Sequence, residues 1–481
     1  MSTVKPISLS ENKILKIGLY SSSLLSKNHI GVSRMIRSHI DVLQNNLGDR
    51  CEFYILSRIS GVSRTSLFVT LPAEEFFREY DETTTTSQTS VKVYKNTTPL
   101  IDSLSHNVVR RISNKLRFNK ISNLIKKVAK KLRNKVAPAE KLQLRQPAKW
   151  KFLNFKLDVL IMAEPWDGTW VYPIEDFTHK IVMIIYDLVP NLLVCDRNDK
   201  DKYFKFYKNN YHVDDGTRIF ADQHFLGFYH GLTKADGVVC ISDCTKRDLI
   251  ELFPEYCEKA CMTVYPTWNQ SFMPLSQYER EEIEICDELK AMRLDFSKPI
   301  VFAINVLDSR KNGLLLVKAF ALLLERQAVT SDVQLVVCSH ARCSHEYLIN
   351  FLDIAKDVNI TWVQNLSDKA MCKLLNLATV FAFPTLYEGF GIPVLEAMIC
   401  KTPVVTSDSS SIPEVTNGNC FFCDPTSVES IASSILEALQ MTQETREELV
   451  NRAFAYASYN FSQEQIYSSY MKLFSKIGIN I

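Results

Sequence analysis

One stretch of the chain, from residue 379 to residue 400, constrains the fold more than any other. Residues 379–383, Thr-Val-Phe-Ala-Phe, form an apolar run typical of a buried strand. Residues 393–400 have the pattern of a short helix with a proline in its first turn. The loop between them contains Gly389 and Gly391, so a ligand can approach the backbone there without meeting a Cβ atom. A strand, a glycine loop and a helix N-terminus together favour an anion site in an α/β domain.

Two glutamates accompany this anion site. Glu388 lies in the loop and Glu396 lies eight residues later, in the expected helix. Carboxylates are poor ligands for phosphate, but they are good acceptors for hydroxyl groups. The stretch therefore predicts a ligand that carries both phosphates and many hydroxyls, as a nucleotide sugar does.

The rest of the chain alternates between strand-like and helix-like segments in two series, which predicts an α/β fold with two Rossmann-like lobes and a cleft between them. The first series contains expected strands at 14–20, 51–56, 157–162, 180–186 and 237–242, with helices at 31–43 and 245–253. The second contains expected strands at 299–304, 333–338, 360–363, 379–383 and 403–406, with helices between them and a last helix at 462–474.

Turn-forming residues cluster at 266–274 and mark a boundary between the two series. We therefore expect an N-terminal, acceptor-side lobe at 1–272 that carries a basic insert at about 60–150. A donor lobe is expected at 273–460, and a C-terminal helix at 461–481 is expected to pack back on the first lobe.

A second anchor for phosphate lies in the turn after the strand 299–304. Arg310 and Lys311 are adjacent there, just before an apolar helix at 314–324. Two cations at the mouth of a strand–helix turn suit a diphosphate, and they can stabilise a leaving diphosphate without a metal ion. Taken alone the pair is typical of a solvated basic turn, but it becomes specific beside the Glu388 loop.

These residues resemble those of a known protein family. The segment 379–425 resembles the retaining glycosyltransferases of family 4, which have the GT-B fold and an E-x7-E motif that matches Glu388 and Glu396. Similar family patterns are Arg310-Lys-Asn, Thr402-Pro-Val-Val-Thr, Ser411-Ile-Pro-Glu-Val, Gly31-Val-Ser-Arg, Tyr186-Asp-Leu-Val-Pro and Ala235-Asp-Gly-Val-Val-Cys-Ile-Ser. The resemblance covers roughly 14–56 and 157–474.

The resemblance implies a role for each matching residue. Lys311, helped by Arg310, would bind the donor diphosphate, and Glu388 would hold the donor sugar together with the loop backbone. Glu396 would accept hydrogen bonds from the ribose hydroxyls, and Gly31 would let the first lobe approach the phosphates. The complete donor-binding set implied in this way is Glu396, Gly389, Phe390, Gly391, Gly31, Asn305 and Asp187.

The resemblance also implies a reaction. The chain would be a hexosyltransferase that moves a sugar, with retention, from a nucleotide-diphosphate sugar to a glycan or lipid-linked acceptor. It would need no metal ion, no cofactor and no side-chain nucleophile. Two positions depart from the family pattern, because Ile304-Asn305 stands where many members have Gly-Arg, and Tyr186-Asp187 where many have His-Asp.

A basic segment interrupts the first series. Residues 110–149 hold fourteen Lys or Arg and a single acid, and their apolar residues recur at helical spacing. Such a helix at 110–137 suits an anionic membrane surface, and equally a solvated helix packed on the first lobe. Binding of nucleic acid is disfavoured, because no recognised module or aromatic platform accompanies the charge. The chain shows no signal peptide and no membrane-spanning run, so we expect a cytoplasmic protein, peripheral at the inner face of the membrane, in polysaccharide biosynthesis.

The thirteen cysteines are scattered, as expected for reduced thiols in a cytoplasm. Four residues of zinc-ligand type crowd into one short segment, Cys338, His340, Cys343 and His345. Structural zinc sites usually place their ligand pairs further apart, so a loop after a strand is the simpler interpretation and the metal question stays open.

Two rival functions remain at this stage. Asp199-Lys-Asp201 fits the D-x-D pattern of metal-dependent GT-A glycosyltransferases, although it lies in a charged stretch where such matches arise by chance. The departures at Tyr186 and Asn305 leave room for a catalytically inactive nucleotide-sugar-binding scaffold.

Overall fold

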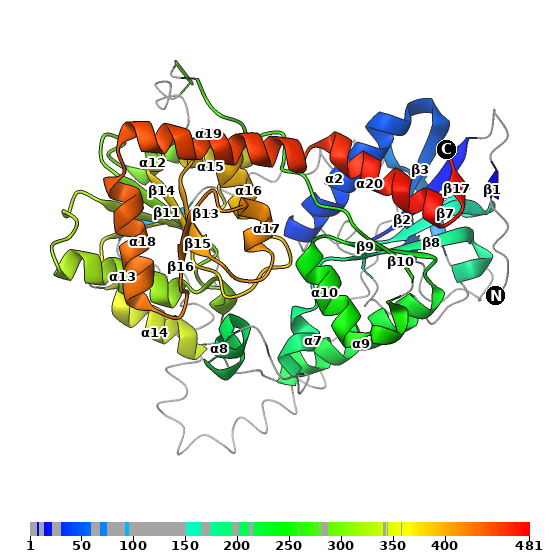
Figure 1. Ribbon diagram of the computed structural model, residues 1–481, viewed down its shortest axis with the longest axis horizontal. Coiled ribbons are helices and arrows are strands. Elements are labelled where there is room, and N and C mark those ends of the chain that lie inside the picture. Colours follow the sequence, from blue (N-terminus) through cyan, green and yellow to red (C-terminus); the bar gives the residue numbers. More distant parts are fainter. Residues whose placement is uncertain are drawn as a thin grey trace, which may run out of the picture.

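The structure is a computed structural model that describes residues 7–8, 14–21, 30–58, 68–74, 92–95, 151–164, 174–194, 202–210, 215–257, 259–276, 278–279, 287–339, 343, 345–356 and 358–481. Two α/β lobes lie side by side (Figure 1). The basic segment 110–149, the Asp199–Asp201 pair and His340 fall outside the described residues.

A largely parallel sheet with the strand order β10-β9-β8-β7-β2-β3-β4-β6 forms the N-terminal lobe. Its pairs are parallel except at β3–β4 and β4–β6. The strands are β2 (Leu15–Tyr20), β3 (Cys51–Arg58), β4 (Phe68–Pro72), β6 (Lys151–Phe152), β7 (Leu157–Met162), β8 (Thr178–Ile185), β9 (Gly237–Cys240) and β10 (Ala260–Thr263). The central strand β7 is buried at every position, because helices cover both faces of a parallel sheet.

The helices of this lobe include α2 (Ile30–Leu47), α7 (Val189–Val194), α9 (Asp215–Lys234) and α10 (Asp243–Leu252). The helix α8 (Lys202–Asn210) comes from the same half of the sequence but lies against the C-terminal lobe, where Lys202 pairs with Asp424 at 3.6 Å (Figure 1). Ser242 caps α10, since its side chain accepts a hydrogen bond from the backbone N–H of Thr245. The helix α2 begins at Ile30, so Gly31 lies in its first turn rather than in the loop before it.

The C-terminal lobe is built on a second sheet with the order β16-β15-β14-β11-β12-β13-β5. Its strands are β11 (Ile300–Ile304), β12 (Gln334–Cys338), β13 (Ile360–Gln364), β14 (Val380–Phe383), β15 (Val404–Ser407), β16 (Phe421–Cys423) and β5 (Lys92–Lys95). Helices around it are α12 (Asp287–Met292), α13 (Gly313–Glu325), α14 (His345–Ala355), α15 (Asp368–Leu377), α16 (Ile392–Ile399), α17 (Ile412–Thr416) and α18 (Val428–Gln440).

The chain returns to the first lobe at its end. The helix α19 (Gln443–Asn460) runs along the C-terminal lobe and α20 (Gln463–Lys476) continues onto the N-terminal lobe (Figure 1). Tyr470 on α20 lies 2.7 Å from Nδ1 of His39 on α2. A short strand, β17 (Ile479–Asn480), then pairs with β1 (Ile7–Ser8) near the start of the chain.

The expected insert contributes to both lobes. The pattern of the sequence lapses between 60 and 150, yet β4 extends the first sheet and β5 pairs antiparallel with β13 of the second sheet. Both strands are short, so alternation of side chains over them is too brief to be recognised in the sequence. Among the described residues, no helix is long and apolar enough to span a membrane.

Candidate active site

Two turns meet at the carboxyl ends of β11 and β14, which are neighbours in the second sheet. The first turn, residues 305–312, contains Arg310 and Lys311, and the second is the loop 384–391. The backbone N–H of Leu386 donates to the carbonyl of Arg310 at 2.8 Å. Asn312, in the left-handed region at φ 62°, donates from its side-chain amide to the carbonyl of Pro384 at 3.1 Å. The two turns are therefore joined by one backbone hydrogen bond and one from the Asn312 side chain.

Close helix packing fixes the first turn. A Cβ atom added at Gly313 would lie 2.2 Å from the carbonyl oxygen of Val306, so only glycine fits at the start of α13. The Asp308 side chain accepts a hydrogen bond from the backbone N–H of Arg310 at 3.0 Å. The direction of the two cations is thus set by the turn that carries them.

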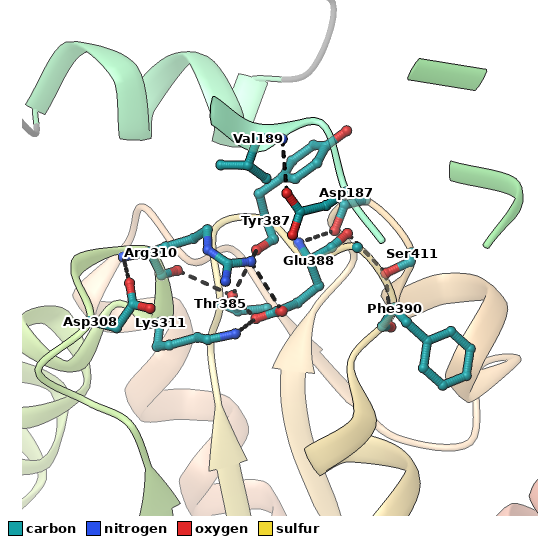
Figure 2. Close-up of polar contacts among 12 residues, drawn as sticks. Asp187, Val189, Asp308, Arg310, Lys311, Thr385, Tyr387, Glu388, Phe390 and Ser411 are labelled. Atoms are coloured by element: carbon teal, nitrogen blue, oxygen red, sulfur yellow. Dashed lines mark hydrogen bonds and ion pairs between the residues drawn. The ribbon is translucent and has the colours of Figure 1, made fainter. Parts of the chain in front are cut away.

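Glu388 is held by both of these cations (Figure 2). One carboxylate oxygen, Oε1, pairs with the Lys311 ammonium and accepts a hydrogen bond from the Thr385 hydroxyl at 2.8 Å. The other, Oε2, lies 3.2 Å from Nη1 of Arg310, which also donates to the carbonyl of Tyr387 at 2.8 Å. Glu388 and Lys311 are 5% and 9% exposed, so the pair is withdrawn from bulk water.

The charges in this cluster support one another. Burial raises the pKa of Glu388, but Lys311 and Arg310 lower it by more, so its carboxyl group stays ionised. Burial and the neighbouring Arg310 lower the pKa of Lys311, and Glu388 opposes that shift. Burial alone would lower the pKa of Arg310, but the carboxylates around it, Glu388 above all, raise it overall. The result is a compact arrangement of two cations against one anion.

Serine hydroxyls orient the Glu388 loop from the far side. Ser410 accepts a hydrogen bond from the backbone N–H of Glu388 at 2.8 Å. Ser411 can donate to the carbonyl of Glu388 at 3.1 Å or of Phe390 at 2.8 Å. Ser409 donates to the carbonyl of Leu386 at 2.7 Å. The loop therefore has a defined shape before any ligand contacts it.

The N-terminal lobe contacts the loop at Gly389. A Cβ atom at this position would lie 2.3 Å from the carbonyl oxygen of Tyr186 and 2.9 Å from Cβ of Asp187. Asp187 is half-buried and accepts a hydrogen bond from the backbone N–H of Val189 at 3.1 Å (Figure 2). Close approach of the two lobes explains a glycine here, at the point where the sequence places the sugar-binding loop.

The remaining residues of the implied donor-binding set lie around this centre at different depths. Glu396 is 7% exposed on α16, whose N-cap residue is Gly391 at φ 103°. Phe390 is buried, whereas Asn305 is exposed at the end of β11, in the left-handed region at φ 52°. Gly31 lies in the first turn of α2, in the other lobe.

The helix α8, from the N-terminal half of the chain, also contacts this site. The sequence did not predict that contact. The ring of Phe204 on α8 lies 4.9 Å from that of Tyr387, centroid to centroid. Tyr207, one turn further along α8, is close enough to Arg310 for the cation to lower its pKa, although burial raises that pKa overall. Thr385, Ser410 and Tyr207 are polar residues of the site that the sequence did not single out. Their types are visible in the sequence, but their partners are set by tertiary contacts.

The cysteine–histidine segment shows no metal geometry in the part that is described. Cys338 and Cys343 are both half-buried, and burial raises the pKa of each thiol to about 11. Throughout the described ranges, no group of three or more His, Cys, Asp or Glu side chains is arranged to hold a metal ion.

Comparison with known proteins supports the interpretation of the second lobe as part of a glycosyltransferase. Residues 288–456 match the family model described as glycosyl transferases group 1. This span includes both turns of the site and the helix α17.

Solved structures resemble the whole chain. HepE from Anabaena, in complex with UDP and glucose, superposes with a TM-score of 0.56 at 14% identity, over 96% of this chain and 99% of that one. Sucrose-phosphate synthase from Thermosynechococcus elongatus gives 0.55 at 13% identity, with the same two coverages. This chain has the GT-B fold. Identities this low show the fold alone, but they extend the GT-B assignment to both lobes.

Curated relatives match part of the GT-B chain. O-antigen chain mannosyltransferase B of Escherichia coli is 27% identical over 233 residues, which is 48% of this chain and 57% of that protein. A serotype-specific mannosyltransferase, WbdA of Escherichia coli, is 24% identical over 276 residues, or 56% of this chain and 30% of that protein. The chain thus spans about half of the first relative's length and a third of the second's.

Proposed function

We propose that this protein is a retaining glycosyltransferase of the family 4 type, a hexosyltransferase that takes its sugar from a nucleotide-diphosphate sugar. One observation carries the proposal: Arg310 and Lys311 lie in direct contact with Glu388, at the carboxyl ends of adjacent strands and beside the other lobe. Cations for a diphosphate and a carboxylate for sugar hydroxyls thus share one place.

The chemistry assigned to these residues is electrostatic. Lys311 and Arg310 would neutralise the charge that grows on the diphosphate as its bond to the sugar breaks. A diphosphate bound there would compete with Glu388 for the two cations, so Glu388 would be released towards the hydroxyls of the donor sugar. Glu396 would accept hydrogen bonds from the ribose. The acceptor would attack from the face that the diphosphate leaves, and the leaving phosphate would take the acceptor proton.

The names of the relatives guide the choice of donor and acceptor. Both reported relatives are named mannosyltransferases, one of them of O-antigen chains, and the HepE structure contains UDP and glucose. We propose a hexose donor, with mannose first, and a glycan or lipid-linked saccharide acceptor in polysaccharide biosynthesis. No metal ion is part of the proposed mechanism, because Lys311 and Arg310 can themselves neutralise the charge of a leaving diphosphate.

A donor screen tests this proposal. Labelled GDP-mannose, UDP-glucose and related nucleotide sugars are offered to the wild type, Glu388→Gln and Lys311→Ala, with release of nucleoside diphosphate and transfer of label as readouts. We expect both variants to lose most transfer, about 100-fold or more. The Lys311→Ala variant should also bind nucleoside diphosphate more weakly. Equal rates in all three proteins would refute the site.

The same screen separates the rivals. Nucleotide sugar that binds the wild type without transfer or hydrolysis would identify an inactive binding scaffold. Loss of transfer in EDTA would favour the metal-dependent GT-A alternative, for which Asp199 and Asp201 were the sequence candidates. Transfer that survives EDTA and inverts the anomeric centre would overturn the retaining mechanism only.

Attachment to an anionic membrane surface through 110–137 is a separate proposal that rests on the sequence. Charge reversal at Lys126, Lys127, Lys130 and Lys131 should release the protein from vesicles that contain anionic lipid. Binding that is unchanged by these four substitutions would remove the idea, together with the peripheral inner-membrane location that depends on it.

A further inference from the structure

The first turn of α10, in the N-terminal lobe, is bonded to the Glu388 loop of the C-terminal lobe. The Ser242 hydroxyl lies 2.5 Å from the carbonyl oxygen of Gly389, to which it can donate. The Thr245 hydroxyl lies 3.2 Å from the same carbonyl oxygen. One turn further along α10, Asp248 accepts a hydrogen bond from the hydroxyl of Tyr387 at 2.6 Å. The N-cap residue of α10 and two side chains of the helix therefore contact the two loop residues that flank Glu388.

A carboxylate from the other lobe caps the same helix. Glu414, on α17, accepts hydrogen bonds from the backbone N–H groups of Asp243 at 2.8 Å and Cys244 at 3.0 Å. The first N–H groups of a helix have no partner within it, and the positive end of the helix dipole favours an anion there. Caps are usually supplied by the residue before the helix, whereas this one comes from about 170 residues further along the chain.

Other contacts hold the Glu414 carboxylate in this position. Tyr265, in the segment that joins the two lobes, lies with its hydroxyl 3.1 Å from Oε2 of Glu414. On the other side, Tyr456 of α19 donates to the backbone carbonyl of Glu414 at 2.8 Å. Glu414 follows Ser411 by three residues, and Ser411 can bond to the carbonyls of Glu388 and Phe390. Glu414 and the Glu388 loop therefore belong to one unit.

We propose that Glu414 and the first turn of α10 form a latch between the lobes, which holds them closed and fixes the Glu388 loop for transfer. Glu414 is a positioning residue in this scheme, because it acts through α10 and the loop and touches no reacting atom. The catalytic part of the inference rests on the proposed function, whereas the latch itself is a statement about lobe contact. Loss of the carboxylate leaves the first turn of α10 without this cap. The hydrogen bonds from Ser242 and Thr245 to the carbonyl of Gly389 are then weakened as well.

Hydrogen–deuterium exchange of Glu414→Ala and of the isosteric Glu414→Gln tests the latch. The amides of Asp243 and Cys244 should exchange about 10-fold faster or more in Glu414→Ala, and by a smaller factor in Glu414→Gln, which keeps one acceptor oxygen. Peptides over 386–391 should follow, while peptides over β7 should stay at the wild-type rate. Glu448→Ala, an exposed glutamate on α19, is the matched control and should change none of these rates.

Kinetics separate positioning from a merely structural role. We expect kcat of Glu414→Ala to fall about 10-fold or more, while binding of nucleoside diphosphate to the Arg310–Lys311 turn stays within about threefold. Partial recovery of kcat in Glu414→Gln would support the graded series. Faster exchange across β7 and α10 alike would show a general loss of stability and would overturn the latch, as would wild-type exchange at Asp243 and Cys244.

The two proposals fail in different ways. If the wild type transfers no sugar from any donor, the proposed function fails, and the exchange rates still decide the latch. If the wild type transfers sugar and Glu414→Ala has wild-type kcat and exchange rates, the latch is wrong and the function stands.

Discussion

Two sets of buried polar side chains, one in each lobe, are in opposite electrostatic states. In the C-terminal lobe, Glu388 is ion-paired with Lys311 and Arg310. In the N-terminal lobe the buried polar groups include two histidines, His39 beside Tyr470 and His224, whose Nδ1 lies 2.7 Å from the side-chain oxygen of Asn191. Burial lowers the pKa of His39 to about 4 and that of His224 to about 3, so both rings are neutral at pH 7.

The N-terminal lobe also buries a charged group, Lys180, in an ion pair with Asp236 at 3.1 Å, so the contrast lies between these two sets of side chains and not between whole lobes. Neutral hydrogen-bonded groups can be buried at little cost. The buried charges of Glu388 and Lys311, beside the partly exposed Arg310, are stabilising only while each has its partner. The charges of the Glu388 cluster lie at the carboxyl ends of neighbouring parallel strands, where ligands bind in such sheets. We therefore interpret the charged cluster as ligand-binding and the histidine contacts as structural, and the following experiments test that distinction.

The largest effect should come from removing the anion of the cluster. Glu388→Ala leaves Lys311 and Arg310 without their shared partner, and we expect it to lower the free energy of unfolding by about 3 kcal/mol. The double variant Lys311→Ala with Glu388→Ala should recover part of that loss, because it removes the unpaired ammonium as well. Denaturant unfolding of the set measures both changes. A loss below about 1 kcal/mol would mean that water already solvates the cations. The charged cluster would then depend on its partners no more than the neutral histidines do.

The sequence predicted that Arg310, Lys311 and Glu388 lie close together, but not that they pair with one another, because they belong to two short patterns with local meaning. Arg310 and Lys311 follow a strand and begin a helix, and Glu388 sits in a glycine loop of the same kind. Neighbouring parallel strands bring their carboxyl ends to one edge, so these patterns converge by topology. The central strands were predicted for the same reason, and β7 begins and ends at the expected residues.

The next effect concerns the contact between the lobes. Gly389→Ala would place a Cβ atom 2.3 Å from the carbonyl oxygen of Tyr186, and backbone on both sides must move to accept it. We expect transfer to fall about 100-fold, since a displacement near 1 Å is enough for such a loss. The Gly418→Ala variant is the control, because its added Cβ meets nothing within 4 Å and only its backbone at φ 74° is strained. Equal activity of the two variants would show that the charged cluster works without the N-terminal lobe.

What the sequence could not predict lies at that contact. The cap of α10 by Glu414 and the approach of α8 to Tyr387 join residues about 170 and 180 positions apart, with no period or motif that links them. The antiparallel pairing of β5 with β13 is equally non-local. These contacts are decided by tertiary arrangement, and single-sequence patterns do not contain that information.

The histidines give a pH-dependent effect of intermediate size. Their folded pKa values are lowered below the ordinary value of 6.5, so the unfolded chain takes up protons first as the pH falls. Their contribution to stability is complete above pH 6.5 and is lost towards pH 4, at about 2 kcal/mol for each histidine by pH 5. Unfolding of wild type and His39→Gln at pH 7.5 and pH 5 measures the difference between the two slopes. Parallel slopes would mean that His39 titrates in the folded protein as it does in the unfolded chain, and that burial beside Tyr470 does not keep its ring neutral.

The smallest effect should come from a neutral group inside the charged region. Tyr387→Phe removes the hydroxyl that donates to Asp248 at 2.6 Å but keeps the ring against Phe204. Asp248 is half-buried, so water can replace the lost donor, and we expect a loss of about 1 kcal/mol in the free energy of unfolding. Tyr459→Phe, at a residue that is 67% exposed, is the control and should change nothing measurable. Tyr387→Phe could instead lower the free energy of unfolding as much as Glu388→Ala does. A neutral hydrogen bond between the lobes would then matter as much as the charged cluster, and charge would not be what distinguishes the cluster from the buried histidines.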